Sequence, residues 1–173
     1  MTKKFTNILI YMIIGLHLAV IQYAYFFLLE AYLSSRSVTY FISLFFWLCG
    51  FLIGLNLPKK NLLLPLIALG LFSYLLSYFM HELFPYRDFL YPVIACTISV
   101  SSLQSGYFFN IVSDSNDKVQ TALVHENNGF VLGTLLCMLA VLYVGWYFLA
   151  FGPTASSCVA ILVAKNWNVV TSK

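Results

Sequence analysis

Three histidines are the residues of this chain that could hold a redox cofactor. His17, His81 and His125 could ligate a haem in pairs or contact a quinone, because imidazole binds metals and carries protons near neutral pH. A bis-histidine haem needs two imidazoles at a similar depth on facing helices. His17 falls near the middle of the first apolar run, His81 at the outer end of the third and His125 at the inner edge of the fifth. We therefore expect no haem and no other cofactor.

Two polar side chains, His17 and Gln22, lie inside the first apolar run. Polar residues at this depth in a membrane tend to be functional or to bond across helices. The two positions are five residues apart, which is more than one helical turn, so they do not share one narrow face. We expect each to hydrogen-bond a neighbouring helix. The alternative is a polar path for a transported solute.

The densest polar cluster beside an apolar run is His125-Glu126-Asn127-Asn128. One interpretation is a helix start, with Asn127 or Asn128 as the N-cap and Glu126 near the positive end of the helix dipole. The other is a binding site in which His125 and Glu126 contact a quinone or a transported solute. Replacing Glu126 separates the two interpretations.

No catalytic motif occurs in the sequence. It has no phosphate-binding glycine loop, no nucleophile elbow and no H-E-x-x-H. Cys49, Cys96, Cys137 and Cys158 are widely spaced inside apolar runs, so we expect buried apolar residues and no metal site. The basic residues are too few for nucleic-acid binding. We predict a protein that is not an enzyme.

The elements that must position these residues are apolar runs of about twenty residues. Of the 173 residues, 61% are hydrophobic and 9% are charged, and the mean hydropathy is +0.88. A charge-poor apolar run of about eighteen residues or more can span a bilayer as a helix. We predict an all-α, polytopic transmembrane helix bundle of five or six spans, forming a single integral membrane domain over residues 1–173. The expected spans are 7–29, 37–57, 61–80, 89–112 and 127–151, with 154–170 as a possible sixth.

A helix-breaking dipeptide and the distribution of basic residues among the loops give the expected topology. Gly152-Pro153 is expected to end the fifth helix. With alternating loops, one side of the membrane receives five lysines and the other receives Arg36 and Arg87. The positive-inside rule then places the N-terminus in the cytoplasm, and we expect a bacterial inner-membrane protein. The five lysines are Lys3, Lys4, Lys59, Lys60 and Lys118.

Two pairs of glycines are spaced four residues apart, Gly50 with Gly54 and Gly129 with Gly133. This spacing puts both glycines of a pair on one helix face, where another backbone can approach closely. We expect both pairs to form helix–helix contacts.

The segment from Gln104 to Leu136 reads QSGYFFNIVSDSNDKVQTALVHENNGFVLGTLL. It resembles the membrane domains associated with spermidine synthases, in which a helix with a glycine and an aromatic leads through a polar loop to a helix opening with G-x-x-x-G. Residues 15–57 are similar to the first hairpin of that family. The matching positions in the later segment are Gln104, Gly106, Phe109, Glu126, Gly129 and Gly133.

The sequence also departs from that family. It has Gln22 where the family usually has glutamate and Asn110 where the family usually has proline. It contains no glycine-rich nucleotide-binding element of an aminopropyltransferase domain. The resemblance therefore implies a shared membrane architecture and not polyamine synthesis.

Three functions are compatible with the sequence. The first is a non-catalytic membrane subunit or scaffold that assembles with partner membrane proteins, or with itself, through its helix faces in the lipid bilayer. The second is a small transporter or half-transporter that works as an oligomer and uses His17, Gln22 and Glu126. The third is a quinone or electron-transfer membrane anchor near His125 and Glu126.

Overall fold

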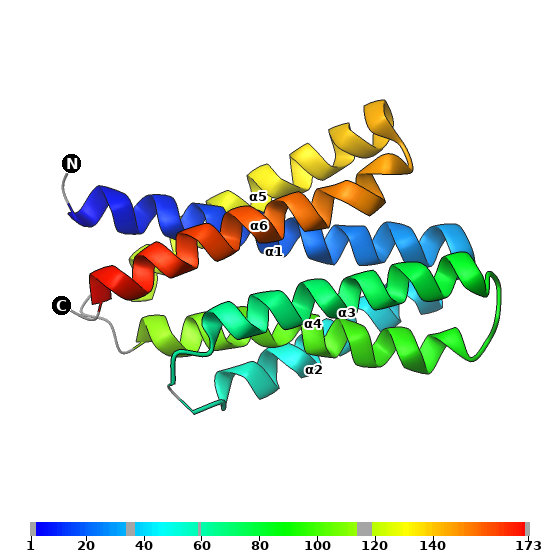
Figure 1. Cartoon of the computed structure of the whole chain (residues 1–173), viewed down its shortest axis with the longest axis horizontal. Coiled ribbons are helices and arrows are strands. Elements are labelled where there is room, and N and C mark those ends of the chain that lie inside the picture. Colours follow the sequence, from blue (N-terminus) through cyan, green and yellow to red (C-terminus); the bar gives the residue numbers. More distant parts are fainter. Residues whose placement is uncertain (1–2, 34–36, 59, 114–118, 172–173) are drawn as a thin grey trace.

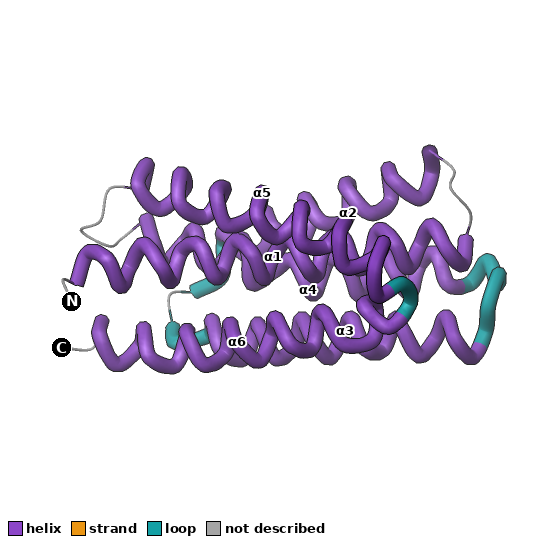
Figure 2. The backbone as a smooth tube through the Cα atoms, turned by 90° about the horizontal axis from the view of Figure 1, so that it is seen from above, coloured by secondary structure: helices purple, strands orange, loops and turns teal. Residues whose placement is uncertain are grey.

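The computed structural model describes residues 3–33, 37–58, 60–113 and 119–171, and these parts form six helices (Figure 1). The backbone of these helices runs nearly parallel along the long axis of the molecule (Figure 2). The helices are α1 (Lys3–Leu33), α2 (Ser37–Leu55), α3 (Leu63–Leu83), α4 (Leu90–Ser113), α5 (Val119–Val144) and α6 (Tyr147–Thr171).

Five of the described helices, all except α4, are long and apolar enough to cross a membrane. The predicted all-α membrane bundle is thereby confirmed, and the chain is an integral membrane protein whose apolar helices contact the bilayer. The start of α1 and the end of α6 lie at the same end of the bundle (Figure 1). Residues 154–170, which we expected as a possible sixth span, lie inside α6, which is long and apolar enough to cross a membrane.

The predicted helix break at Gly152-Pro153 is wrong. Pro153 lies inside α6, and the turn between α5 and α6 is at Gly145, whose φ of 62° is in the left-handed region that glycine adopts freely. A proline inside a helix has no N–H for the carbonyl four residues before it. Here the Tyr74 hydroxyl of α3 donates to the Leu149 carbonyl at 2.7 Å, so the exposed backbone group is satisfied and the helix continues.

The predicted helix start at Asn127 or Asn128 is also wrong. α5 begins at Val119, and both asparagines lie in its interior. The residues between Val119 and His125 include no proline or glycine that would stop a helix from forming earlier. Glu126 is therefore two turns inside α5 and is not close to the dipole end of the helix.

The Gly50–Gly54 pair faces α4. A Cβ at Gly50 would overlap the backbone carbonyl of Ser99, and Gly54 lies against the same helix one turn further on. Gly106 of α4 completes the seam, because a Cβ there would overlap the carbonyl of Phe51. The two backbones are in direct contact along this α2–α4 seam.

The Gly129–Gly133 pair faces α1 in the same way. A Cβ at Gly129 would overlap the Met12 carbonyl, and Gly133 packs against α1 one turn later. Gly15 of α1 approaches the Glu126 carbonyl equally closely. Small residues thus bring α1 and α5 into backbone contact along the α1–α5 seam.

Candidate functional site

The centre of the bundle holds a buried imidazole that bonds two other helices. His17 of α1 is only 1% exposed. Its Nε2 lies 3.1 Å from Gln104 Oε1 of α4, and its Nδ1 lies 3.2 Å from Ser156 Oγ of α6. Nε2–H donates to the amide carbonyl of Gln104. The Ser156 hydroxyl, which also donates to the Pro153 carbonyl of α6 at 3.1 Å, is the neighbour of Nδ1. Three helices therefore meet at one polar contact.

A second layer of hydrogen bonds lies one turn away on α4. The Tyr25 hydroxyl of α1 is 2.9 Å from Ser101 Oγ, which in turn donates to the Gly70 carbonyl of α3 at 2.9 Å. The amide nitrogen of Gln104 is buried beside Gly70 and has no hydrogen-bond partner among the described residues. This layer connects α1, α3 and α4.

A third layer joins α3 to α4. Ser77 and Thr97 hydroxyls are 2.5 Å apart, and the Nδ1–H of His81 donates to the Ser77 carbonyl at 2.7 Å. The Nε2 of His81 is buried without a hydrogen-bond partner in the described part of the chain. Since Nδ1 carries the proton, Nε2 is a free acceptor.

The carboxylate of Glu82 lies beyond the third layer, at the end of α3. Glu82 Oε1 accepts from the Tyr32 hydroxyl at 2.7 Å and from Trp146 Nε1 at 3.2 Å. The Tyr32 ring lies 5.2 Å from the His81 ring, measured between centroids. Glu82 thus joins the ends of α1 and α3 to the turn between α5 and α6.

We call the three layers around His17, Ser101 and Ser77 the polar column, which does not include Glu82. Its side chains come from α1, α3, α4 and α6 and are buried or half-buried. The members are His17, Tyr25, Ser77, His81, Thr97, Ser101, Gln104 and Ser156.

Three residues that the sequence singled out, His17, His81 and Gln104, belong to the polar column, and His17 and Gln104 are in direct contact. The hydroxyl-bearing members of the column were missed. Thr97, Ser101 and Gln104 are spaced four and three residues apart, which places them on one face of a helix. That spacing is the signal that could have found them.

Glu126 and His125 do not share a hydrogen bond with the polar column. The Glu126 side chain is 6% exposed and lies in α5 at the α1–α5 seam, while His125 is half-buried. In the described ranges the Glu126 carboxyl has no hydrogen bond or ion pair. The two residues are neighbours in sequence and form no recorded joint site.

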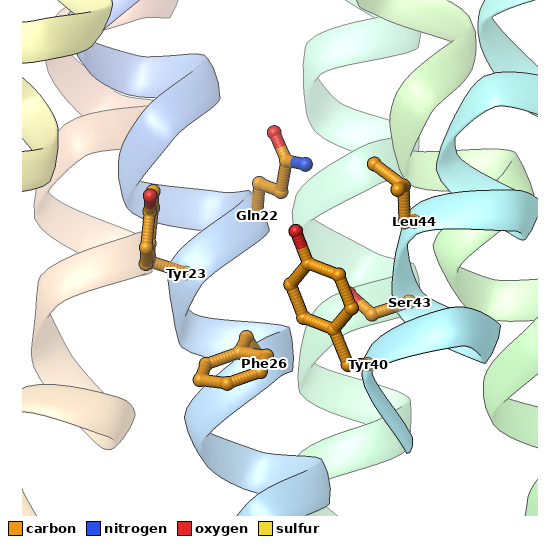
Figure 3. A pocket seen from close by; sticks show the side chains of 6 residues that line it. All are labelled: Gln22, Tyr23, Phe26, Tyr40, Ser43 and Leu44. Carbon is orange, nitrogen blue, oxygen red and sulfur yellow. The ribbon is translucent and has the colours of Figure 1, made fainter. Parts of the chain in front are cut away.

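Gln22 lies outside the polar column as well. It lines a groove of about 120 Å³ between α1 and α2. Figure 3 shows its amide and the Tyr40 hydroxyl directed toward the same opening. The other lining residues are Tyr23, Phe26, Ser43 and Leu44.

The described residues hold no cluster of three or more His, Cys, Asp or Glu side chains that could bind a metal. The four cysteines are free thiols. Cys137 is buried and Cys49 is half-buried, whereas Cys96 and Cys158 are exposed on the outer face of the bundle. The prediction that all four are buried is therefore wrong for the last two, which lie where a helix meets lipid.

Comparison with protein-family models, with curated proteins and with solved structures finds no match to this chain. The similarity to membrane domains associated with spermidine synthases stays a prediction based on the residues quoted above. What the fold establishes is an integral membrane bundle with a hydrogen-bonded polar interior and a groove that opens between α1 and α2.

Proposed function

We propose that this chain is a non-catalytic membrane subunit that assembles with partner membrane proteins through the outer face of α5. The observation that carries the proposal is the peripheral position of α5. Of the most apolar 18-residue stretch of α5, only 17% is buried inside the chain, against 61% of the corresponding stretch of α1. α5 packs against α1 along the α1–α5 seam, and the rest of its surface is available for contact with a partner.

The outer face of α5 is a ridge of large apolar side chains. A partner helix would pack on this ridge by shape, because lipid tails are as apolar as leucine and give little hydrophobic drive to helix association. The paired glycines do not serve this purpose, since both pairs face helices of the same chain. The ridge consists of Val131, Leu132, Leu135, Leu136, Leu139, Leu142 and Tyr143.

The test is purification of a tagged full-length chain in a gentle detergent, followed by mass spectrometry of the bound proteins. Stoichiometric partners that are lost when the α5 ridge is altered, for example by Leu135→Ala with Leu139→Ala, support the proposal. Glu126→Ala is a useful companion variant, because unchanged assembly and activity would remove Glu126 as a functional site. A homo-oligomer supports self-assembly only if the same ridge variants dissociate it, and a monomer without partners contradicts the proposal.

A second candidate function is a small transporter that works as an oligomer, and the polar column favours it. Hydroxyl and imidazole groups at hydrogen-bond distance inside a membrane are the kind of groups from which proton relays are built. His17 belongs to this column, whereas Gln22 and Glu126 do not share its hydrogen bonds. The chain reconstituted in vesicles with an internal pH-sensitive dye gives the test. Proton flux that is lost in His17→Leu and kept in Gln22→Leu supports transport, and no flux above empty vesicles contradicts it.

A further inference from the structure

The groove between α1 and α2 lies within two membrane-spanning segments and is lined by polar groups that are not members of the polar column. The Gln22 amide and the Tyr40 hydroxyl form no hydrogen bond with any described residue. Ser43 is 5% exposed, lines the same groove and likewise has no hydrogen-bond partner in the described part of the chain. Polar groups without a partner are costly inside a membrane span, so the Gln22 amide and the nearly buried Ser43 hydroxyl indicate an occupant that bonds them. Tyr40, which is exposed near the start of α2, adds a third polar group at the same opening.

The chemistry of the lining selects the occupant. No lining residue is charged, so an ion would enter without a counter-charge, which is unfavourable inside a bilayer. The amide and the hydroxyls can each donate and accept hydrogen bonds. Phe26 and Tyr40 form an apolar corner, with ring centroids 5.9 Å apart and the rings nearly perpendicular.

The size of the groove sets a further limit. Its volume of about 120 Å³ is somewhat smaller than that of a cavity of about 150 Å³ that binds benzene, so it accommodates one small head group. Because the groove opens at the outer surface of the bundle, an apolar tail attached to that head group can remain in the bilayer. Tyr40 and Leu44 are exposed at its edge.

We propose that the α1–α2 groove binds the neutral, oxygen-bearing head group of a membrane-dissolved molecule with an apolar tail. Gln22, Tyr40 and Ser43 supply the hydrogen bonds, and Phe26 supplies an apolar wall. The head group is either a ring carbonyl, as in a quinone, or a hydroxyl, as in a long-chain alcohol. The site is independent of the partner-binding ridge on α5.

The test is equilibrium binding of tritiated probes to the purified full chain in lipid nanodiscs. Decylubiquinone and dodecan-1-ol carry the two head groups, and decylbenzene has a similar tail without oxygen. We expect saturable binding near one probe per chain for at least one oxygen-bearing probe, and only non-saturable partitioning for decylbenzene. The probe that saturates identifies the head group as carbonyl or hydroxyl.

Single-residue variants locate the site. We expect Gln22→Leu and Tyr40→Phe each to weaken binding roughly three- to tenfold, as removal of one neutral hydrogen bond does. Tyr143→Phe, which removes a hydroxyl from the exposed face of α5, is the matched control and should bind like the unaltered chain. If Gln22→Leu fails to fold, Tyr40→Phe still tests the site because it removes a single oxygen atom.

Three results would overturn the proposal. Saturable binding of decylbenzene with the same affinity would make the groove a purely apolar contact. Unchanged binding in both variants would place the probe elsewhere. Absence of saturable binding, with a photo-crosslinker at position 22 instead capturing a polypeptide, would assign the groove to a partner helix.

Discussion

The helices α4 and α5 have opposite relations to the rest of the bundle. Thirteen of the 24 residues of α4 are buried, but only five of the 26 residues of α5. Yet α5 is apolar enough to qualify as a membrane span and α4 is not. The more polar helix is the more buried one, which is the reverse of the pattern in a water-soluble domain.

The difference shows what hydropathy measures in this molecule. α4 is covered by its neighbours, so its serines and Gln104 bond other helices and need not face lipid. Most of the surface of α5 lies outside the core of the chain, and inside a membrane that surface must be apolar whether lipid or a partner helix covers it. The hydropathy of these two helices therefore reports position at the outside of the bundle and not burial in its core.

The largest expected effect comes from widening the α2–α4 seam. Gly106→Ala places a Cβ in the carbonyl of Phe51, and neither backbone can move without displacing α4 from the other helices around it. We expect a loss of about 3 kcal/mol or more in the free energy of unfolding, measured by unfolding in SDS. Gly129→Ala, in the α1–α5 seam, should cost less because α5 can separate without disturbing α4.

The control for both variants is Gly152→Ala. The three heavy atoms nearest to a Cβ at Gly152 belong to the ring of Phe148, so a side chain and not a backbone must shift. Equal losses for Gly106→Ala and Gly129→Ala would contradict the distinction between a central and a peripheral helix.

A smaller effect is expected from His17→Leu. The substitution leaves Gln104 and Ser156 without their shared partner in the bundle interior. We expect a loss of about 1–2 kcal/mol in the free energy of unfolding. Adding Gln104→Leu should recover part of this loss, because both sides of the contact are then apolar. Strictly additive losses in the double variant would show that the two side chains act independently.

The sequence located most of the elements because their boundaries are local. Charge-poor runs fix the approximate extents of α1 to α4, and the glycine spacing correctly marks faces of close approach. The continuation of α6 through Pro153 was missed because the donor to the Leu149 carbonyl is Tyr74, which lies 75 residues away in the chain. A proline reads as a helix end unless the donor that satisfies the exposed carbonyl is known.

The candidate site was predictable only in part. His17 and Gln104 were each identified, His17 from its depth and Gln104 from a family resemblance, but they lie 87 residues apart and nothing in the sequence pairs them. Serine and threonine in α4 are small and common in membrane helices, so their roles become visible only when the helices that they face are known. The outward direction of Gln22 also depends on the packing of α1 against α2.

The third prediction concerns the junction between α3 and the proline of α6. Tyr74→Phe should lower the free energy of unfolding by about 1 kcal/mol, because the Leu149 carbonyl loses its donor. In a Pro153→Ala background the new backbone N–H can bond that carbonyl, so Tyr74→Phe should then cost less. A double-mutant cycle in SDS unfolding measures the difference. Equal costs in both backgrounds would contradict the role assigned to Tyr74.

The smallest effect on stability is expected on the outer face of α5. Leu142 is 78% exposed and packs little against its own chain. Leu142→Ala should therefore change the free energy of unfolding by less than about 0.5 kcal/mol, which SDS unfolding can check. If α5 is the partner-binding helix, the same substitution should reduce the amount of co-purified partner although the chain itself remains stable. Retained assembly together with retained stability would mean that this part of α5 meets only lipid, and the contrast with α4 would then reflect the bilayer alone.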